Sequence, residues 1–146
     1  SANQALDRII NFFPDERREQ LLMDLSLNLR GLVSQRLIPR ESGSGRIAAM
    51  EIMLNSPLIQ DLIFKGEVAK IKEVMARSTR IGMKTFDQAL FELYETGYVS
   101  YEDALRNADS KNELRLKIKL ESKRENKHVD DGGALRIVEE EQGRVI

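Results

Sequence analysis

Apolar residues recur at helical spacing through most of the chain. Between residues 3 and 13 they fall three and four positions apart, which predicts one buried helical face of Leu6, Ile9, Ile10 and Phe13. A second helix is predicted from Pro14 to Arg30, because proline is favoured in a first helical turn. Its predicted buried face consists of five leucines, namely Leu21, Leu22, Leu25, Leu29 and Leu32.

The pattern changes between residues 32 and 54. Two runs with β-branched and small residues, 32–40 and 46–54, flank a Gly- and Ser-rich loop at 41–45, which predicts a β-hairpin. Apolar residues occupy both alternating positions, as in strands that are covered on both faces. Glu51 interrupts the second run, and a buried carboxylate usually has a cationic partner. Arg36 or Arg46, across the hairpin, is the expected partner.

Helical spacing returns after Asn55. Ser56 followed by Pro57 is a typical helix start, and it predicts a short helix that closes near Gly66. Further helices are predicted near 68–75, 85–97 and 100–108, the second of them opened by a capping box of Thr85 and Gln88. The predicted fold class is therefore mostly α with a β-hairpin (α+β).

The last part of the chain has a different pattern. Apolar and charged residues alternate strictly from 113 to 121, which predicts an edge strand over residues 111–122. Residues 123–146 show no helical or strand period and are expected to form a mobile charged tail.

Composition excludes several classes of site. The 146 residues include no cysteine and a single histidine, which rules out disulfide scaffolds, thiol nucleophiles and metal sites built from several imidazoles. The net charge of −1 argues against a nucleic-acid-binding protein. The segment 111–127 is locally basic, and a solvated face is favoured there over contact with nucleic acid or acidic lipid.

No catalytic, cofactor-binding or metal-binding residue is predicted in this chain. A phosphate-binding P-loop needs a Gly-Lys pair, and the sequence contains none. The segment Gly82–Thr85 is similar but has its lysine displaced, so we predict a loop and a helix cap there.

Four passages resemble the carboxyl-terminal part of type IV pilus retraction ATPases, the PilT/PilU group of the secretion ATPase superfamily. They are NFFP (11–14), LSLNLRGLVSQRLI (25–38), GRIAAMEIMLNSPLIQDLI (45–63) and IGMKTFDQAL (81–90). The resemblance covers roughly residues 3–122, and the charged ending looks more like the PilU type.

The resemblance implies that a longer parent is a hexameric motor of pilus retraction and twitching motility. It makes residues 1–54 the C-terminal edge of a RecA-like P-loop ATPase core and residues 55–110 an appended helical domain. The nucleotide-binding boxes, with ATP and Mg, would precede Ser1, so this fragment alone is expected to be inactive. The implied partners are further copies, pilus motor platform proteins and a related retraction ATPase, but no nucleic acid. The implied location is cytoplasmic and peripheral, at the pilus base on the inner membrane.

One family motif aligns with residues 58–65, the retraction signature of the PilT type. Its apolar framework is kept, whereas its arginines and closing glutamate are replaced. The residues expected to contact a partner are Leu58, Ile59, Gln60, Asp61, Leu62 and Ile63. The alternative is an amphipathic helix that only packs, and the alternative function is a free-standing helical adapter that binds another protein.

Overall fold

The computed structural model describes residues 1–124, and the rest of the predicted tail, 125–146, lies outside the described residues. The helices are α1 (Ala2–Phe12), α2 (Arg18–Asn28), α3 (Pro57–Phe64), α4 (Ile71–Arg77), α5 (Phe86–Glu95), α6 (Tyr101–Asn107) and α7 (Lys111–Glu121). The strands are β1 (Gly31–Pro39) and β2 (Arg46–Leu54), and 3₁₀ turns occupy Asp15–Arg17, Val68–Lys70 and Thr79–Ile81. The mostly α fold with one β-hairpin is confirmed.

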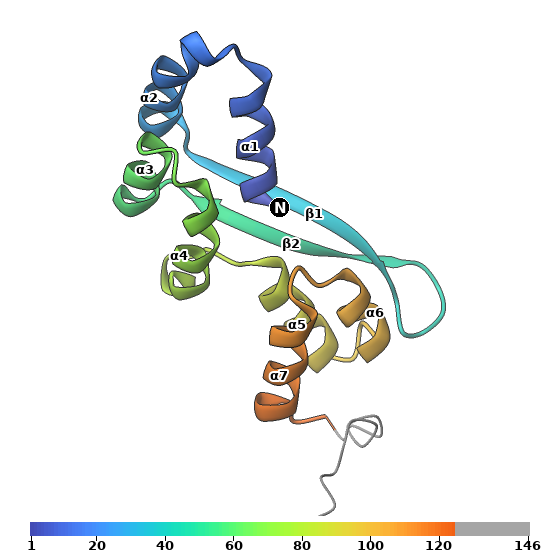
Figure 1. Cartoon of the computed structure of the whole chain (residues 1–146). Coiled ribbons are helices and arrows are strands. Elements are labelled where there is room, and N and C mark those ends of the chain that lie inside the picture. The colour runs from blue at the N-terminus through green and yellow to red at the C-terminus, as the bar shows by residue number, and fades with distance from the viewer. Residues whose placement is uncertain (125–146) are drawn as a thin grey trace, which may run out of the picture.

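The hairpin is long and antiparallel, and it pairs from Gly31 opposite Leu54 to Pro39 opposite Arg46. Gly43 and Gly45 in its loop have positive φ angles, which glycine adopts without strain. Figure 1 shows the hairpin running from the group α1–α4 to the group α5–α7.

Buried side chains form two separate cores, and β2 contributes to both. The first core joins α1, α3 and α4, and its members are Ala2, Leu6, Ile10, Met53, Ile59, Leu62, Ile63, Val68, Ile71, Met75 and Met83. The second joins the hairpin with α5, α6 and α7, and its members are Ile38, Ala49, Phe86, Ala89, Leu90, Tyr94, Val99, Ala104, Leu105, Leu114 and Ile118. Leu22, Leu25 and Leu29 of α2 are partly buried against the first core. The first core contains residues from both sides of residue 54, where the sequence predicts a boundary between two domains. That boundary stays a prediction.

One face of the hairpin is open in residues 1–124. Val33 and Leu37 on this face are 64% and 54% exposed, whereas Ile38 on the opposite face is fully buried. The expectation of strands covered on both faces is therefore wrong for this part of the chain. β1 has β2 as its only described partner strand, and the outer edge of β2 is bridged at Ile52, whose backbone exchanges hydrogen bonds of 2.8 and 2.9 Å with Lys84.

The predicted edge strand at 111–122 is wrong, because residues 111–121 form helix α7. Leu114 and Ile118, four residues apart, are buried in the second core. Leu116 and Leu120 are 56% and 73% exposed. α7 thus has an inner and an outer apolar stripe, and together these two stripes produce the alternation in the sequence.

The first two residues of the predicted mobile tail are anchored to the fold. The backbone N–H of Lys123 donates to the carboxylate of Glu95 at 2.7 Å. The guanidinium of Arg124 donates to both carboxylate oxygens of Glu41, at 3.1 and 3.0 Å, and to the carbonyl of Tyr94 at 2.7 Å. This arginine therefore joins the end of α7 to the hairpin loop.

Candidate functional site

Helix α3, which carries the residues expected to contact a partner, begins and ends where the sequence predicts. The Ser56 hydroxyl accepts the N–H of Ile59 at 3.4 Å, and Pro57 occupies the first helical position. Gly66, with φ of 70°, follows the last turn, because this left-handed conformation is easily adopted by glycine.

The six predicted contact residues lie on two faces of α3. Ile59, Leu62 and Ile63 are buried in the first core, so they hold the helix in place. Leu58 is 54% exposed, Asp61 is exposed and Gln60 is partly exposed. Only these last three can reach another molecule.

The polar side of α3 carries an ion pair. The Asp61 carboxylate and the Lys65 ammonium are 2.8 Å apart, and both side chains are about half exposed. The hydrogen bond from this ammonium to Asp61, reinforced by the charge of that carboxylate, raises the pKa of Lys65. An exposed pair of this kind adds little stability, so both charges are available to a partner.

A shallow depression of about 250 Å³ lies between α3 and α4. It is lined by Leu58, Leu62, Lys70, Glu73, Val74, Arg77 and Ser78. Its apolar part comes from the two leucines and Val74, and its charged part includes the Arg77–Glu73 ion pair at 2.6 Å. An apolar floor with a charged rim suits a protein contact and offers no group for catalysis.

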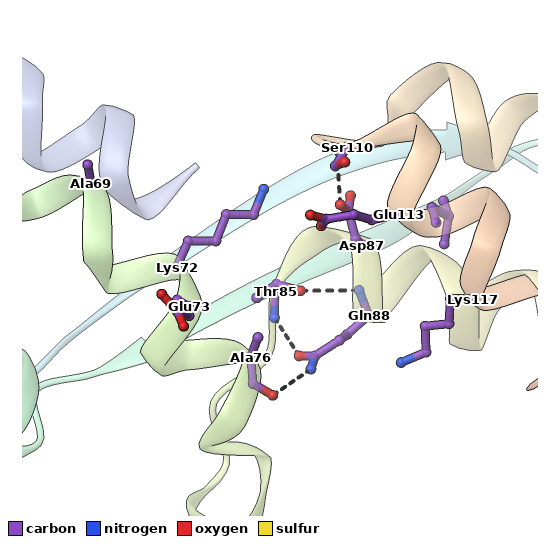
Figure 2. A pocket seen from close by; sticks show the side chains of 11 residues that line it. Ala69, Lys72, Glu73, Ala76, Thr85, Asp87, Gln88, Ser110, Glu113 and Lys117 are labelled. Carbon is purple, nitrogen blue, oxygen red and sulfur yellow. Dashed lines mark hydrogen bonds between the residues drawn. The ribbon is translucent and has the colours of Figure 1, made fainter.

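A larger cleft, of about 580 Å³, lies among α4, α5 and α7 and is drawn in Figure 2. Several of its polar groups already bind neighbouring residues. Thr85 and Gln88 form the predicted capping box, with hydrogen bonds of 3.0 and 3.3 Å, and the Gln88 amide also donates to the Ala76 carbonyl at 3.0 Å. The Asp87 carboxylate accepts the N–H of Ser110 at 3.0 Å. These contacts hold the helices together and leave no convergent set aimed at a ligand.

Asp109 links distant elements at one end of this region. Its carboxylate binds Arg36 of β1 at 2.8 Å and Lys72 of α4 at 3.0 Å. Burial, the largest single effect, raises the pKa of Asp109, but the hydrogen bonds and charges of the two cations together outweigh it and leave the pKa below its ordinary value. The sequence analysis missed this residue, because an isolated aspartate in a loop carries no local signal of partners so far away.

Glu51 does not have the cationic partner that the sequence predicts. Its carboxylate accepts the backbone N–H of Ala2 at 2.5 Å and that of Phe86 at 3.3 Å. These are the first residues of α1 and α5, so the positive ends of two helices take the place of a cation. Arg36 binds Asp109 instead, and Arg46 donates to a backbone carbonyl of the hairpin.

The segment that resembles a P-loop, Gly82–Thr85, leads into helix α5. Gly82 ends a 3₁₀ turn and Thr85 caps α5, so this segment is a loop and a cap, as predicted. Within residues 1–124, no group of three or more acidic, histidine or cysteine residues is placed to hold a metal ion. No helix of that part is long and apolar enough to cross a membrane.

The sequence of the chain is similar to those of known pilus ATPases. No protein-family model matches the chain. The chain is 57% identical over 129 residues, 88% of its length, to the type IV pilus ATPase PilU of Pseudomonas aeruginosa, and covers 34% of that protein. It is 36% identical over 108 residues, 74% of its length, to the type IV pilus retraction ATPase PilT of the same organism, and covers 31% of it.

The fold agrees with the sequence comparison. A crystal structure of the pilus retraction motor PilT with bound ADP superposes with a TM-score of 0.69 and 31% identity, over 79% of this chain and 32% of that one. The X-ray structure of the Legionella pneumophila ATPase DotB shares the fold, with a TM-score of 0.58 at 17% identity, over 71% of this chain and 28% of that one. The chain spans about a third of the length of the curated relatives that it matches. By sequence and by fold, the chain is a segment of a PilT/PilU-type pilus retraction ATPase, nearer to PilU than to PilT.

Proposed function

We propose that the parent protein is a hexameric ATPase that powers type IV pilus retraction and twitching motility, and that this chain is its C-terminal part. The observation that carries the proposal is the 57% identity to PilU over 129 residues. In the proposal, ATP and Mg bind in the parent outside this chain. The parent works in the cytoplasm, peripheral to the inner membrane at the pilus base, with pilus motor platform proteins and a related retraction ATPase as partners.

The open side of the hairpin supports a role as part of a larger protein. A free-standing domain normally protects a nine-residue edge strand such as β1, because an unpaired edge invites aggregation. The exposed Val33 and Leu37 are therefore better explained by a covering segment of the parent than by an independent adapter. On this basis residues 1–54 belong to the edge of the RecA-like core, and residues 55–110 form the appended helical domain.

Two observations test this proposal. The full-length coding sequence should contain a P-loop segment upstream of Ser1, and its absence would favour the free-standing adapter. Deleting the gene should reduce twitching, measured as colony expansion, and the full-length gene should restore it while the present chain alone should not. Normal twitching in the deletion strain would contradict the proposed function.

We further propose that α3 contacts a partner of the motor through Leu58, Gln60 and Asp61. Gln60→Ala combined with Asp61→Ala should change the free energy of unfolding by less than about 0.5 kcal/mol, because both side chains lie at the surface. The same pair of substitutions in the full-length protein should impair twitching.

Leu62→Ala is the matched packing variant on the same helix. It should cost about 2–5 kcal/mol, because it leaves a cavity in the first core. If the polar double variant assembles, hydrolyses ATP and supports normal twitching in the full-length protein, α3 serves only packing.

A further inference from the structure

The outer side of α7 carries a regular row of positive charge. Three exposed cations of α7 follow one another at intervals of four residues, namely Lys111, Arg115 and Lys119, and the exposed Lys123 lies just beyond the end of the helix at Glu121. Residues four apart lie on one side of a helix, and the exposed Leu116 and Leu120 form a parallel apolar line beside the row. We call these six residues the α7 outer stripe.

The cations of the stripe are exposed, although the charge of Lys123 acts on the nearby Glu95 carboxylate and helps to lower its pKa. None of the four has an ion pair within 4 Å among the described residues, whereas the neighbouring Lys117 lies 3.8 Å from Glu121. The inner side of α7 is fixed by Leu114 and Ile118 in the second core. The helix therefore presents its outer stripe in one orientation. Residues 111–124 contain five basic residues besides Arg124 and two acidic ones, although the whole chain has a net charge of −1.

The shape of the stripe favours a broad surface over a protein partner. α7 has eleven residues, so its outer face is about 16 Å long and about 10 Å wide, on the order of 160 Å² in projection. A stable protein interface needs about 800 Å² on each partner. The cleft of Figure 2 lies on the inner side of α7, where Leu114 and Lys117 line it, and no residue of the stripe belongs to it.

We propose that the α7 outer stripe is a contact for the surface of an anionic phospholipid bilayer. The four cations meet lipid phosphates, and Leu116 and Leu120 enter the boundary between headgroups and acyl chains. A bilayer needs no complementary pocket, and each cation near an anionic surface strengthens binding about five-fold. The inference deepens the proposed function and rests on it only for the location at the inner membrane. It depends on α7 alone and is tested without ATP or pili, so its failure would leave the proposed ATPase function standing.

The test is co-sedimentation of the chain with vesicles. One set contains phosphatidylcholine alone, and the other an equal mixture of phosphatidylcholine and phosphatidylglycerol. The chain should bind only the anionic set, and binding should fall steeply between about 0.1 M and about 1 M salt, as the Debye length shrinks from about 10 to about 3 Å.

A matched pair of variants separates the stripe from overall charge. The stripe variant replaces four cations by glutamine, namely Lys111→Gln, Arg115→Gln, Lys119→Gln and Lys123→Gln. The control variant replaces four exposed arginines elsewhere on the fold, namely Arg8→Gln, Arg17→Gln, Arg30→Gln and Arg80→Gln. The stripe variant should bind several hundred-fold more weakly than the unmodified chain, and the control within a few-fold of it. Leu116→Gln with Leu120→Gln should weaken binding while leaving its salt dependence unchanged.

Three outcomes would overturn the proposal. The first is that the unmodified chain does not sediment with anionic vesicles. The second is that the stripe and control variants lose binding equally, which would reduce the effect to net charge. The third is that the chain ignores vesicles but binds an acidic amphipathic peptide through the stripe. Circular dichroism checks that each variant is folded. If the stripe variant is unfolded, the proposal is tested by the leucine variant and by the salt dependence of binding of the unmodified chain.

Discussion

Replacing Glu51 by alanine should destabilise the whole fold. The residue is only 1% exposed, and its carboxylate accepts the N–H of Ala2 and the N–H of Phe86. Both donors stand in the first turn of a helix, where the backbone N–H has no partner within the helix itself. Alanine would leave both of these buried donors without an acceptor.

The magnitude follows from the two lost hydrogen bonds. Each buried donor left unsatisfied costs about 1–3 kcal/mol, which gives about 2–6 kcal/mol for the pair. Removing a buried charge recovers part of this cost, so we expect Glu51→Ala to lower the free energy of unfolding by about 3–4 kcal/mol. Glu51→Gln keeps one acceptor oxygen but turns an NH₂ group toward the other backbone N–H. Its cost should therefore be about 1–3 kcal/mol.

Urea unfolding followed by circular dichroism measures these differences, provided that the slope of the transition stays unchanged. Glu19→Ala is the control, because Glu19 is an exposed acid in the first turn of α2 and should change stability by less than about 0.5 kcal/mol. A loss below about 1 kcal/mol for Glu51→Ala would refute the reasoning, because the two donors would then have found other acceptors.

Three further predictions follow from α7, Asp109 and the missing P-loop. Ile118→Ala should lower the free energy of unfolding by about 2–5 kcal/mol, and Leu116→Asp by less than about 0.5 kcal/mol, in thermal or urea unfolding. Equal losses of stability would contradict the assignment of Ile118 to the buried side of α7 and Leu116 to its exposed side. Because the pKa of Asp109 is lowered in the folded state, its ion pairs should stabilise the fold above the ordinary aspartate pKa, and this stabilisation should be lost as pH falls through the lower folded value. In Asp109→Asn the melting temperature should therefore fall less steeply at acidic pH than in the unmodified chain. Calorimetric titration of the chain with ATP and Mg should show no binding, and a micromolar affinity would reveal a nucleotide site that the sequence does not indicate.

Local signals predicted the helix starts well. A cap depends on residues within four positions of each other, so Ser56 with Pro57 and the pair Thr85 and Gln88 could be identified without knowledge of the rest of the fold. The interior polar contacts could not, because they join residues far apart in sequence. Asp109 and Arg36 are 73 positions apart, and nothing local pairs them.

The error at residues 111–122 has a different cause. Leucines at every second position suggested a strand, yet Leu, Lys, Arg and Glu are strong helix formers, and the segment contains a single β-branched residue, Ile118. Helix propensity therefore favoured the helix, whereas the leucines on its outer side produced an alternation that hid the helical spacing of the buried residues.

For α3, helical spacing was enough to predict its buried and outer faces. Which outer residues meet a partner depends on other molecules, so the sequence of this chain does not determine it.

The sharing of β2 between the two cores has a mechanical consequence. Met53 anchors the strand in the first core and Ala49 anchors it in the second, only four residues away. Glu51 lies between them and binds the leading ends of α1 and α5. A swing of α1–α4 against α5–α7 would therefore have to twist this short stretch and stretch the bond between Lys72 and Asp109. Torque applied to α3 would reach α7 as the rotation of a nearly rigid body, with little of it absorbed by a flexible joint.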